Sequence, residues 1–188
     1  MDRRIFLTSC GSLALYAIAC GAAFAKPLSD ACTTDKLDWY GLDGLDCQAL
    51  LAALPAICHQ EISGILNEEN AICIELDDLR YVLAGTRHLV YLSGAASGSG
   101  AIQDAVQQAM LAAPSSLQGI EKLLVMLTCN GSFLHLPDIE VLQQCIEDYV
   151  GKNTKFALGT IHNERMLADE IRIGILAPYA TTFWVSSP

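Results

Sequence analysis

The cysteines are the side chains whose number and spacing point most directly to a chemistry, namely disulfide formation. Six of them follow residue 25, namely Cys32, Cys47, Cys58, Cys73, Cys129 and Cys145. An even set of cysteines predicts disulfides in an exported protein, and residues 1–25 predict that this chain is exported. Intervals of 15 or 16 residues favour bridges between neighbouring helices, which would pair Cys32–Cys47, Cys58–Cys73 and Cys129–Cys145. The other possible pairings stay open at this point.

No other arrangement of reactive side chains predicts an active site. Cys58 precedes His59, but neighbours in a helix point about 100° apart, so they do not automatically form a nucleophile–base pair. His88, His135 and His162 have no histidine at i, i+4 spacing, and the sequence contains no CxxC pair. We therefore expect no catalytic, cofactor-binding or metal-binding residues in the chain.

The segment over 93–100 consists of small residues, and its end, Gly98-Ser99-Gly100, has the composition of a phosphate-binding loop but lacks the other features of one. Gln103 stands where a third glycine is expected, and no Lys-Ser/Thr pair ends the segment. A phosphate loop also follows a strand, whereas the pattern before this segment predicts a helix. We therefore interpret the segment as a linker.

Residues 1–25 predict a cleavable export signal. Arg3 and Arg4 precede an apolar stretch over 13–19, and the segment ends on Ala23-Phe24-Ala25. Paired arginines are typical of the bacterial twin-arginine route. We expect cleavage after Ala25 and a periplasmic protein. A general secretory signal and lipoprotein processing at Cys20 are the alternatives.

The chain is both acidic and apolar. Its 188 residues include 11 basic and 21 acidic side chains, a net charge of −10, which repels phosphate backbones and excludes nucleic-acid binding. Apolar residues make up 52% and charged residues 17%, against about 25% charged in an average soluble domain. Either an apolar surface held against another subunit or a helical core with few long polar side chains would account for this excess.

Apolar periodicity predicts a mainly α fold. The segments with helical spacing are 45–66, 75–92, 101–113, 115–128, 137–150 and 163–169. Pro137 suits a first helical turn and Gly151 a helix end. Ile171, Ile173 and Ile175 alternate with other residues as in an extended segment. We expect an irregular helical domain of about five to six helices with an extended C-terminal tail.

Four short motifs follow one another in the second half of the chain. They are Leu92-Ser93 with the glycine turn and helix after it, Ile146-Glu147-Asp148-Tyr149-Val150-Gly151, Glu164-Arg165-Met166-Leu167, and the closing Pro178-Tyr179 with Phe183-Trp184-Val185-Ser186-Ser187-Pro188. Together with the twin-arginine-like signal, they resemble the small (gamma) subunits of bacterial membrane-bound, FAD-dependent sugar and polyol dehydrogenases. The chain then divides into the signal 1–25, a cysteine-rich helical extension 26–88 and a small-subunit-like helical domain 89–188.

The resemblance implies a non-catalytic accessory subunit that binds, helps to fold and co-exports a flavoprotein catalytic subunit. FAD would reside in that partner and no cofactor in this chain, and a cytochrome c or iron–sulfur subunit would carry the electrons onward. The complex would be periplasmic or peripheral on the inner membrane. Large aromatic side chains are favoured interface anchors, so Tyr179, Phe183 and Trp184 are the expected partner contacts.

Two other functions are compatible with the sequence. One is a free-standing exported helical domain, stapled by disulfides, that binds a small apolar ligand in its interior. The other is an enzyme that works through Cys58 or through the dispersed histidines.

Overall fold

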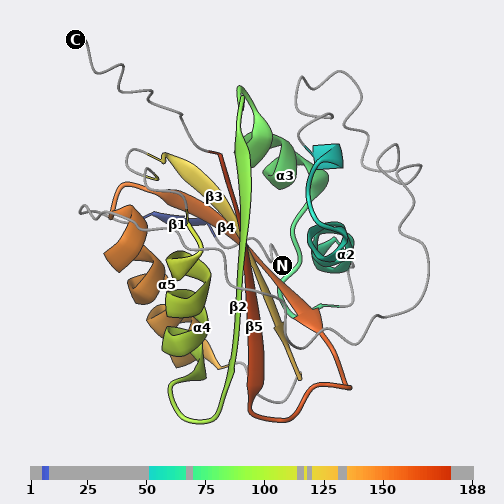
Figure 1. The fold of residues 1–188 in the computed structure, drawn as a ribbon, viewed down its shortest axis with the longest axis vertical. Coiled ribbons are helices and arrows are strands. Elements are labelled where there is room, and N and C mark those ends of the chain that lie inside the picture. The colour runs from blue at the N-terminus through green and yellow to red at the C-terminus, as the bar shows by residue number, and fades with distance from the viewer. Residues whose placement is uncertain are drawn as a thin grey trace.

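A five-stranded mixed β-sheet organises the chain (Figure 1). The computed structural model describes residues 6–8, 51–66, 70–113, 117, 120–130 and 135–178. In chain order the elements are β1 (Phe6–Thr8), α2 (Ala56–Ile65), α3 (Leu76–Leu83), β2 (Leu89–Ser97), α4 (Ala101–Leu111), β3 (Lys122–Cys129), α5 (Leu136–Val150), β4 (Lys155–His162) and β5 (Glu170–Pro178).

The strands lie in the order β1-β4-β3-β5-β2. β3 and β4 are parallel, and the helix α5 makes the crossover between them. The other three pairs, β1–β4, β3–β5 and β2–β5, are antiparallel. β3 is therefore central, and β2 forms one edge over nine residues.

Helices cover both faces of the sheet, with α4 and α5 on one side and α2 and α3 on the other (Figure 1). Successive side chains of β3 point to opposite faces of the sheet, so they are divided between the two helix-covered layers. Leu123, Val125 and Leu127 pack under α4 and α5, and Leu124 and Met126 pack under α2 and α3. The apolar excess of the composition is thus used to bury a sheet on both faces.

The predicted mainly α fold is wrong, because the second half of the chain supplies four strands. The segment predicted as a helix over 115–128 contains β3, which is buried from Leu123 to Cys129. A short apolar run with no polar face fits a doubly covered strand as well as it fits a buried helix. In the segment predicted as a helix over 75–92, the helix α3 ends at Leu83, and the strand β2 begins at Leu89. The segment 163–169 forms turns rather than a helix.

Two predicted helices and one extended segment are confirmed. α4 covers Ala101–Leu111, and α5 begins with Pro137 in its first turn. Gly151 ends α5 with φ of 96°, a conformation that favours glycine. The alternating isoleucines lie on β5, where Ile171, Ile173 and Ile175 are buried.

Two of the predicted disulfides are also wrong, because Cys58, Cys73, Cys129 and Cys145 are free thiols. The predicted spacing assumed helices at both ends of each bridge. Cys129 is instead the last residue of β3, and Cys73 precedes α3 outside any helix. The third pair, Cys32–Cys47, lies outside the described residues.

The free thiols predict a graded pattern of alkylation. Cys58 is 0% and Cys129 3% exposed, whereas Cys73 and Cys145 are half-buried. In protein purified without reductant, iodoacetamide at pH 8 should label Cys73 and Cys145 first, and all four after denaturation. Peptide-resolved mass spectrometry measures this directly. A bridged Cys58–Cys73 or Cys129–Cys145 peptide would contradict the structure.

Several sequence predictions fall on residues outside the described part of the chain. These are the export-signal arginines Arg3 and Arg4 and the partner contacts Tyr179, Phe183 and Trp184. Cleavage after Ala25 and the three regions 1–25, 26–88 and 89–188 stay predictions. Residues 6–8 pair with β4 as β1, so cleavage after Ala25 would remove that strand. Among the described helices, none has the length and apolar content to cross a membrane.

Candidate functional site

A buried carboxyl group lies between α2 and the sheet. The buried stripe of α2 contains Cys58, Ile62 and Ile65 at helical spacing, and Glu61 shares it with an exposure of 4%. The Tyr91 hydroxyl on β2 donates a hydrogen bond of 2.8 Å to Glu61 Oε2. Glu61 Oε1 is buried and finds no hydrogen-bond partner in the part of the chain that the structure describes.

A glycine on β5 makes room for this carboxyl. A Cβ atom at Gly174 would collide with Glu61 Oε2 and lie 3.2 Å from the Met126 methyl carbon. Gly174 stands opposite Ser93 in the β2–β5 register, so the carboxyl lies over the backbone of the sheet. A larger residue at 174 would displace it.

Burial raises the pKa of Glu61 from 4.5 to about 7, although the Tyr91 hydrogen bond and the positive charge of Arg172 act in the opposite direction. Burial also raises the pKa of Tyr91, and the Glu61 charge adds to that shift. Near neutral pH, Glu61 therefore titrates while the tyrosine keeps its proton. The geometry offers a proton-linked group in the core rather than an open catalytic site.

Cys58 and His59 do not form an activated pair. Cys58 lies in the apolar layer, and burial, followed by the nearby Glu61, raises the pKa of its thiol. His59 Nε2 is instead 3.3 Å from the carbonyl oxygen of Leu54. A buried, protonated thiol is inert as a nucleophile, so the enzyme hypothesis based on Cys58 has no support here.

The sequence analysis missed Glu61, although a signal was present. Glu61 stands three residues after Cys58 and four before Ile65, so it falls within the apolar stripe of the helix that was predicted there. A carboxylate in such a stripe is rare without a partner. That partner, Tyr91, comes from a segment that was predicted as a helix.

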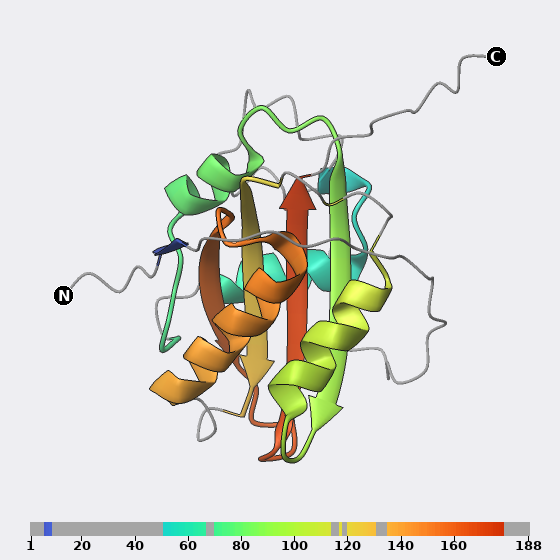
Figure 2. The same cartoon turned by 90° about the vertical axis from the view of Figure 1, so that its left-hand side faces the viewer.

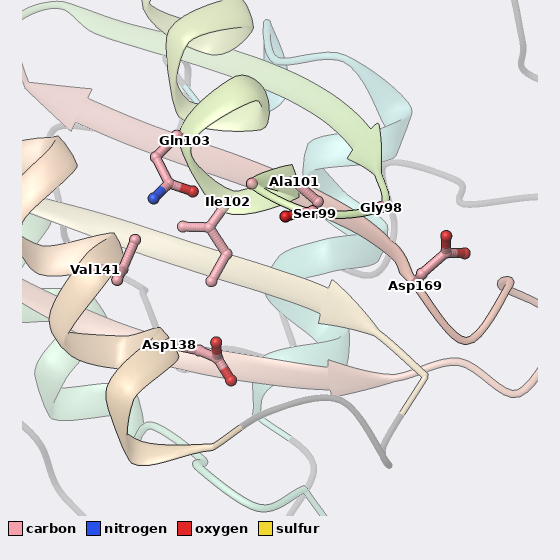
Figure 3. Close-up of a pocket in the computed structure, with 9 residues that line it drawn as sticks. Gly98, Ser99, Ala101, Ile102, Gln103, Asp138, Val141 and Asp169 are labelled. Carbon is pink, nitrogen blue, oxygen red and sulfur yellow. The ribbon is translucent and has the colours of Figure 1, made fainter.

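A cavity of about 550 Å³ opens at the turn between β2 and α4 (Figure 3). It is lined by Gly98, Ser99, Gly100, Ala101, Ile102, Gln103, Asp138, Val141 and Asp169. Asp138 accepts a hydrogen bond from the backbone N–H of His135 and caps α5. Gly98 N–H donates to the carbonyl oxygen of Asp169, which ties this turn to the β4–β5 turn.

The predicted connector over 93–100 is wrong for its first five residues, which belong to β2, so the glycine turn follows a strand and not a helix. β2 ends at Ser97, and α4 begins at Ala101 with Gly100 as its N-cap at φ of 86°. The walls of the cavity still disfavour a phosphate, since Asp138 and Asp169 both line it and carboxylates repel anions. No group of three or more potential metal ligands occurs among the described residues to offset that charge.

The strands run between two ends of the sheet (Figure 2), and these ends differ in their charged residues. The strands β3 and β4 end beside the β2–α4 and β4–β5 turns, at the end we call the acidic end. Its charged residues are the acidic Asp104, Asp138, Glu140, Glu164, Asp169 and Glu170 and the basic Arg165 and Arg172. The opposite end, which we call the basic end, holds the starts of β2, β3 and β4 and five of the seven lysine and arginine residues that the structure describes: Arg80, Arg87, Lys122, Lys152 and Lys155. Acidic residues lie at this end too, namely Glu121 and, on α3 and the last turn of α5, Glu75, Asp77, Asp78, Glu147 and Asp148.

Both ends also expose large apolar side chains. Leu136 is 69% and Leu167 67% exposed at the acidic end. Tyr81 is 43% and Leu111 55% exposed at the basic end. Lys122 Nζ donates to the carbonyl oxygens of Tyr81 and Ala84, and it lies 5.1 Å from the Tyr81 ring centre.

The fold is similar to that of FtsZ. An FtsZ dimer from M. jannaschii matches with a TM-score of 0.54 at 13% identity, covering 77% of this chain and 43% of that one. A tyrosine-for-tryptophan mutant of M. jannaschii FtsZ matches with a TM-score of 0.51 at 12% identity, covering 69% and 43%. CetZ1 from Haloferax volcanii gives 0.48 at 20% identity, covering 58% and 34%. The chain thus spans less than half the length of these proteins. Its sequence matches no protein-family model and no curated protein.

These findings correct the resemblance to the small subunits of dehydrogenases. A mixed α/β sheet with an FtsZ-like fold contradicts that family, and with it the escort function, the flavoprotein partner and the cytochrome c or iron–sulfur carrier. The alternative, a disulfide-stapled helical domain for an apolar ligand, fails for the same reason and because the four described cysteines are free. The periplasmic location, which the export signal and the resemblance predicted, finds no support in the FtsZ-like fold. Nothing in the described residues supports an oxidoreductase complex.

Proposed function

We propose that this chain acts by associating with further copies of itself, end to end, rather than by catalysis. The observation that carries the proposal is that most lysine and arginine side chains of the described residues gather at one end while the other end is mainly acidic, with exposed apolar side chains at both. Complementary charges steer and orient protein contacts, and apolar side chains at the same place supply the buried area. The likeness to an FtsZ solved as a dimer supports an associating fold.

The proposed contact joins two different surfaces. Such a heterologous contact does not close on itself, so repeated addition produces an open chain of copies unless the rotation happens to close a ring. Leu136 and Leu167 of one copy would face Leu111 and Tyr81 of the next. The association needs no cofactor in this chain.

Salt should weaken the association without abolishing it. The Debye length is about 8 Å at 0.15 M salt and about 3 Å at 1 M, so the ion pairs lose strength while the apolar contact remains. In sedimentation velocity of the full chain, we expect a mean sedimentation coefficient that rises with concentration at 0.15 M salt and rises less at 1 M. A monomer at every concentration would overturn the proposal.

Charge reversal at one end gives the sharper form of this experiment. Lys152→Glu with Lys155→Glu makes the basic end acidic, and both lysines are exposed. This variant should stay monomeric at concentrations where the natural chain associates. Gln107→Glu, on the exposed face midway along α4, is the control, because it adds negative charge away from both ends, and it should associate normally.

A further inference from the structure

Glu61 is the only carboxyl among the described residues that combines deep burial with an unpartnered oxygen. Three ionisable groups face it from the elements packed around it: Cys58 from its own helix, Tyr91 from β2 and Arg172 from β5. Ser93, beside Tyr91 on β2, bonds to the tyrosine side chain. Met126 of β3 lies in the same apolar layer as Cys58 and Ile62 of α2.

Ionisation of Glu61 in this place is costly. Among the described residues, only Tyr91 hydrogen-bonds the carboxyl, and a carboxylate buried without sufficient hydrogen bonds is strongly unfavourable. In the protonated form the carboxyl is neutral, and burying a neutral group costs less desolvation free energy than burying a carboxylate. The cost of ionisation falls if water reaches the carboxyl, and that requires α2 to move away from the sheet.

α2 is well placed to move as a unit. It has ten residues and no side-chain N-cap hydrogen bond, and a helix that short is marginal by itself. Its position therefore depends on packing, chiefly that of Cys58, Ile62 and Ile65 on the sheet. After the helix, Asn70 Nδ2 donates to the Gly64 carbonyl oxygen at 2.6 Å and holds its carboxyl end.

We propose that Glu61 makes the docking of α2 depend on its proton: neutral Glu61 keeps the helix on the sheet, and ionised Glu61 releases it. Release uncovers part of the apolar layer on β3 and β4, where α2 packs, including Met126, which is 0% exposed when α2 is docked. Local opening of a weakly held element is a common mode of motion in folded proteins. This proton-dependent docking of α2 is independent of the proposed association through the ends of the sheet.

Hydrogen exchange across pH 5.5 to 8 tests this proposal on the full chain. The pKa of Glu61 is 4.5 in water and about 7 when buried, so the opening equilibrium of α2 should rise about twenty-fold over this range, beyond the intrinsic chemical rate. Peptides from α2 report the opening, and peptides from α5 serve as the internal reference. Glu61→Gln should remove the pH dependence, and Glu140→Gln should keep it.

A second variant distinguishes the proposed device from a general loosening. The Tyr91 hydrogen bond lowers the pKa of Glu61, so in Tyr91→Phe the rise in α2 opening should continue to higher pH before it levels off. Equal pH dependence of α2 exchange in the natural chain and in Glu61→Gln would overturn the proposal. So would α2 protection that stays constant with pH in the natural chain.

Discussion

Gly94→Ala is expected to cost about 3 kcal/mol of folding free energy or more, although it adds a single methyl group. The Cβ atom would collide with the Ala105 carbonyl oxygen and lie 2.7 Å from the Ala109 nitrogen. Both are backbone atoms of α4, so no side-chain rotation relieves the contact. The helix itself would have to lift from β2. Domains of this size are stable by only about 5–15 kcal/mol.

Urea denaturation followed by circular dichroism measures this loss as a lower midpoint. Ala95→Ser is the matched control, because it adds one heavy atom at the next position of β2 on its exposed side. The control should leave the midpoint nearly unchanged. An unchanged midpoint in Gly94→Ala would mean that α4 does not lie on β2 at this distance.

Glu61→Gln is expected to stabilise the protein at pH 8 and to leave it nearly unchanged at pH 4.5. Burial raises the pKa of Glu61 to about 7, so the folded state binds more protons than the unfolded state between pH 4.5 and 7. The stability of the natural chain is therefore full below pH 4.5 and falls as the pH rises through 7. The amide that replaces the carboxyl carries no charge, so the variant avoids a loss of about 3 kcal/mol.

The measurement is the urea midpoint of both proteins at several pH values. The difference between them should grow from pH 5 to pH 8 and then level off. Glu140→Gln, on the exposed face of α5, should follow the natural chain at every pH. A difference between Glu61→Gln and the natural chain that does not vary with pH would contradict a buried, proton-linked carboxyl.

The elements that could be predicted from the sequence are those with a distinct local signal. α5 has Pro137 in its first turn and Gly151 at its end, and α4 follows a glycine turn with a clear apolar stripe. β5 alternates because Arg172 and Gly174 interrupt its isoleucines. Each of these signals comes from the residues of the element itself.

The strands that were missed have patterns that depend on other parts of the chain. β3 is apolar at successive positions because helices cover both of its faces, and that coverage is not visible in the local sequence. β4, over Lys155–His162, was not identified at all. Gly94 and Gly174 are placed by contacts with α4 and with Glu61, so their role appears only when distant segments come together.

The candidate site was missed for the same reason. Glu61 and Tyr91 are 30 residues apart, and they meet only because β2 is a strand that passes beneath α2. The charge difference between the two ends was not predicted either. Lys152 precedes β4 and Glu164 follows it, so the two residues lie at opposite ends of the sheet, and that strand was not identified from the sequence. The overall charge of −10 gave no indication of that separation.

Mixing two charge-reversed variants tests the proposed end-to-end association most directly. One variant carries Lys152→Glu and Lys155→Glu at the basic end, and the other carries Glu164→Lys and Asp169→Lys at the acidic end. Each should sediment as a monomer alone, because its altered end no longer carries the charge that complements its other end. Mixed in equal amounts, they should restore association, since each reversed end fits the other variant. Two variants that associate alone, or a mixture that stays monomeric while the natural chain associates, would contradict the account.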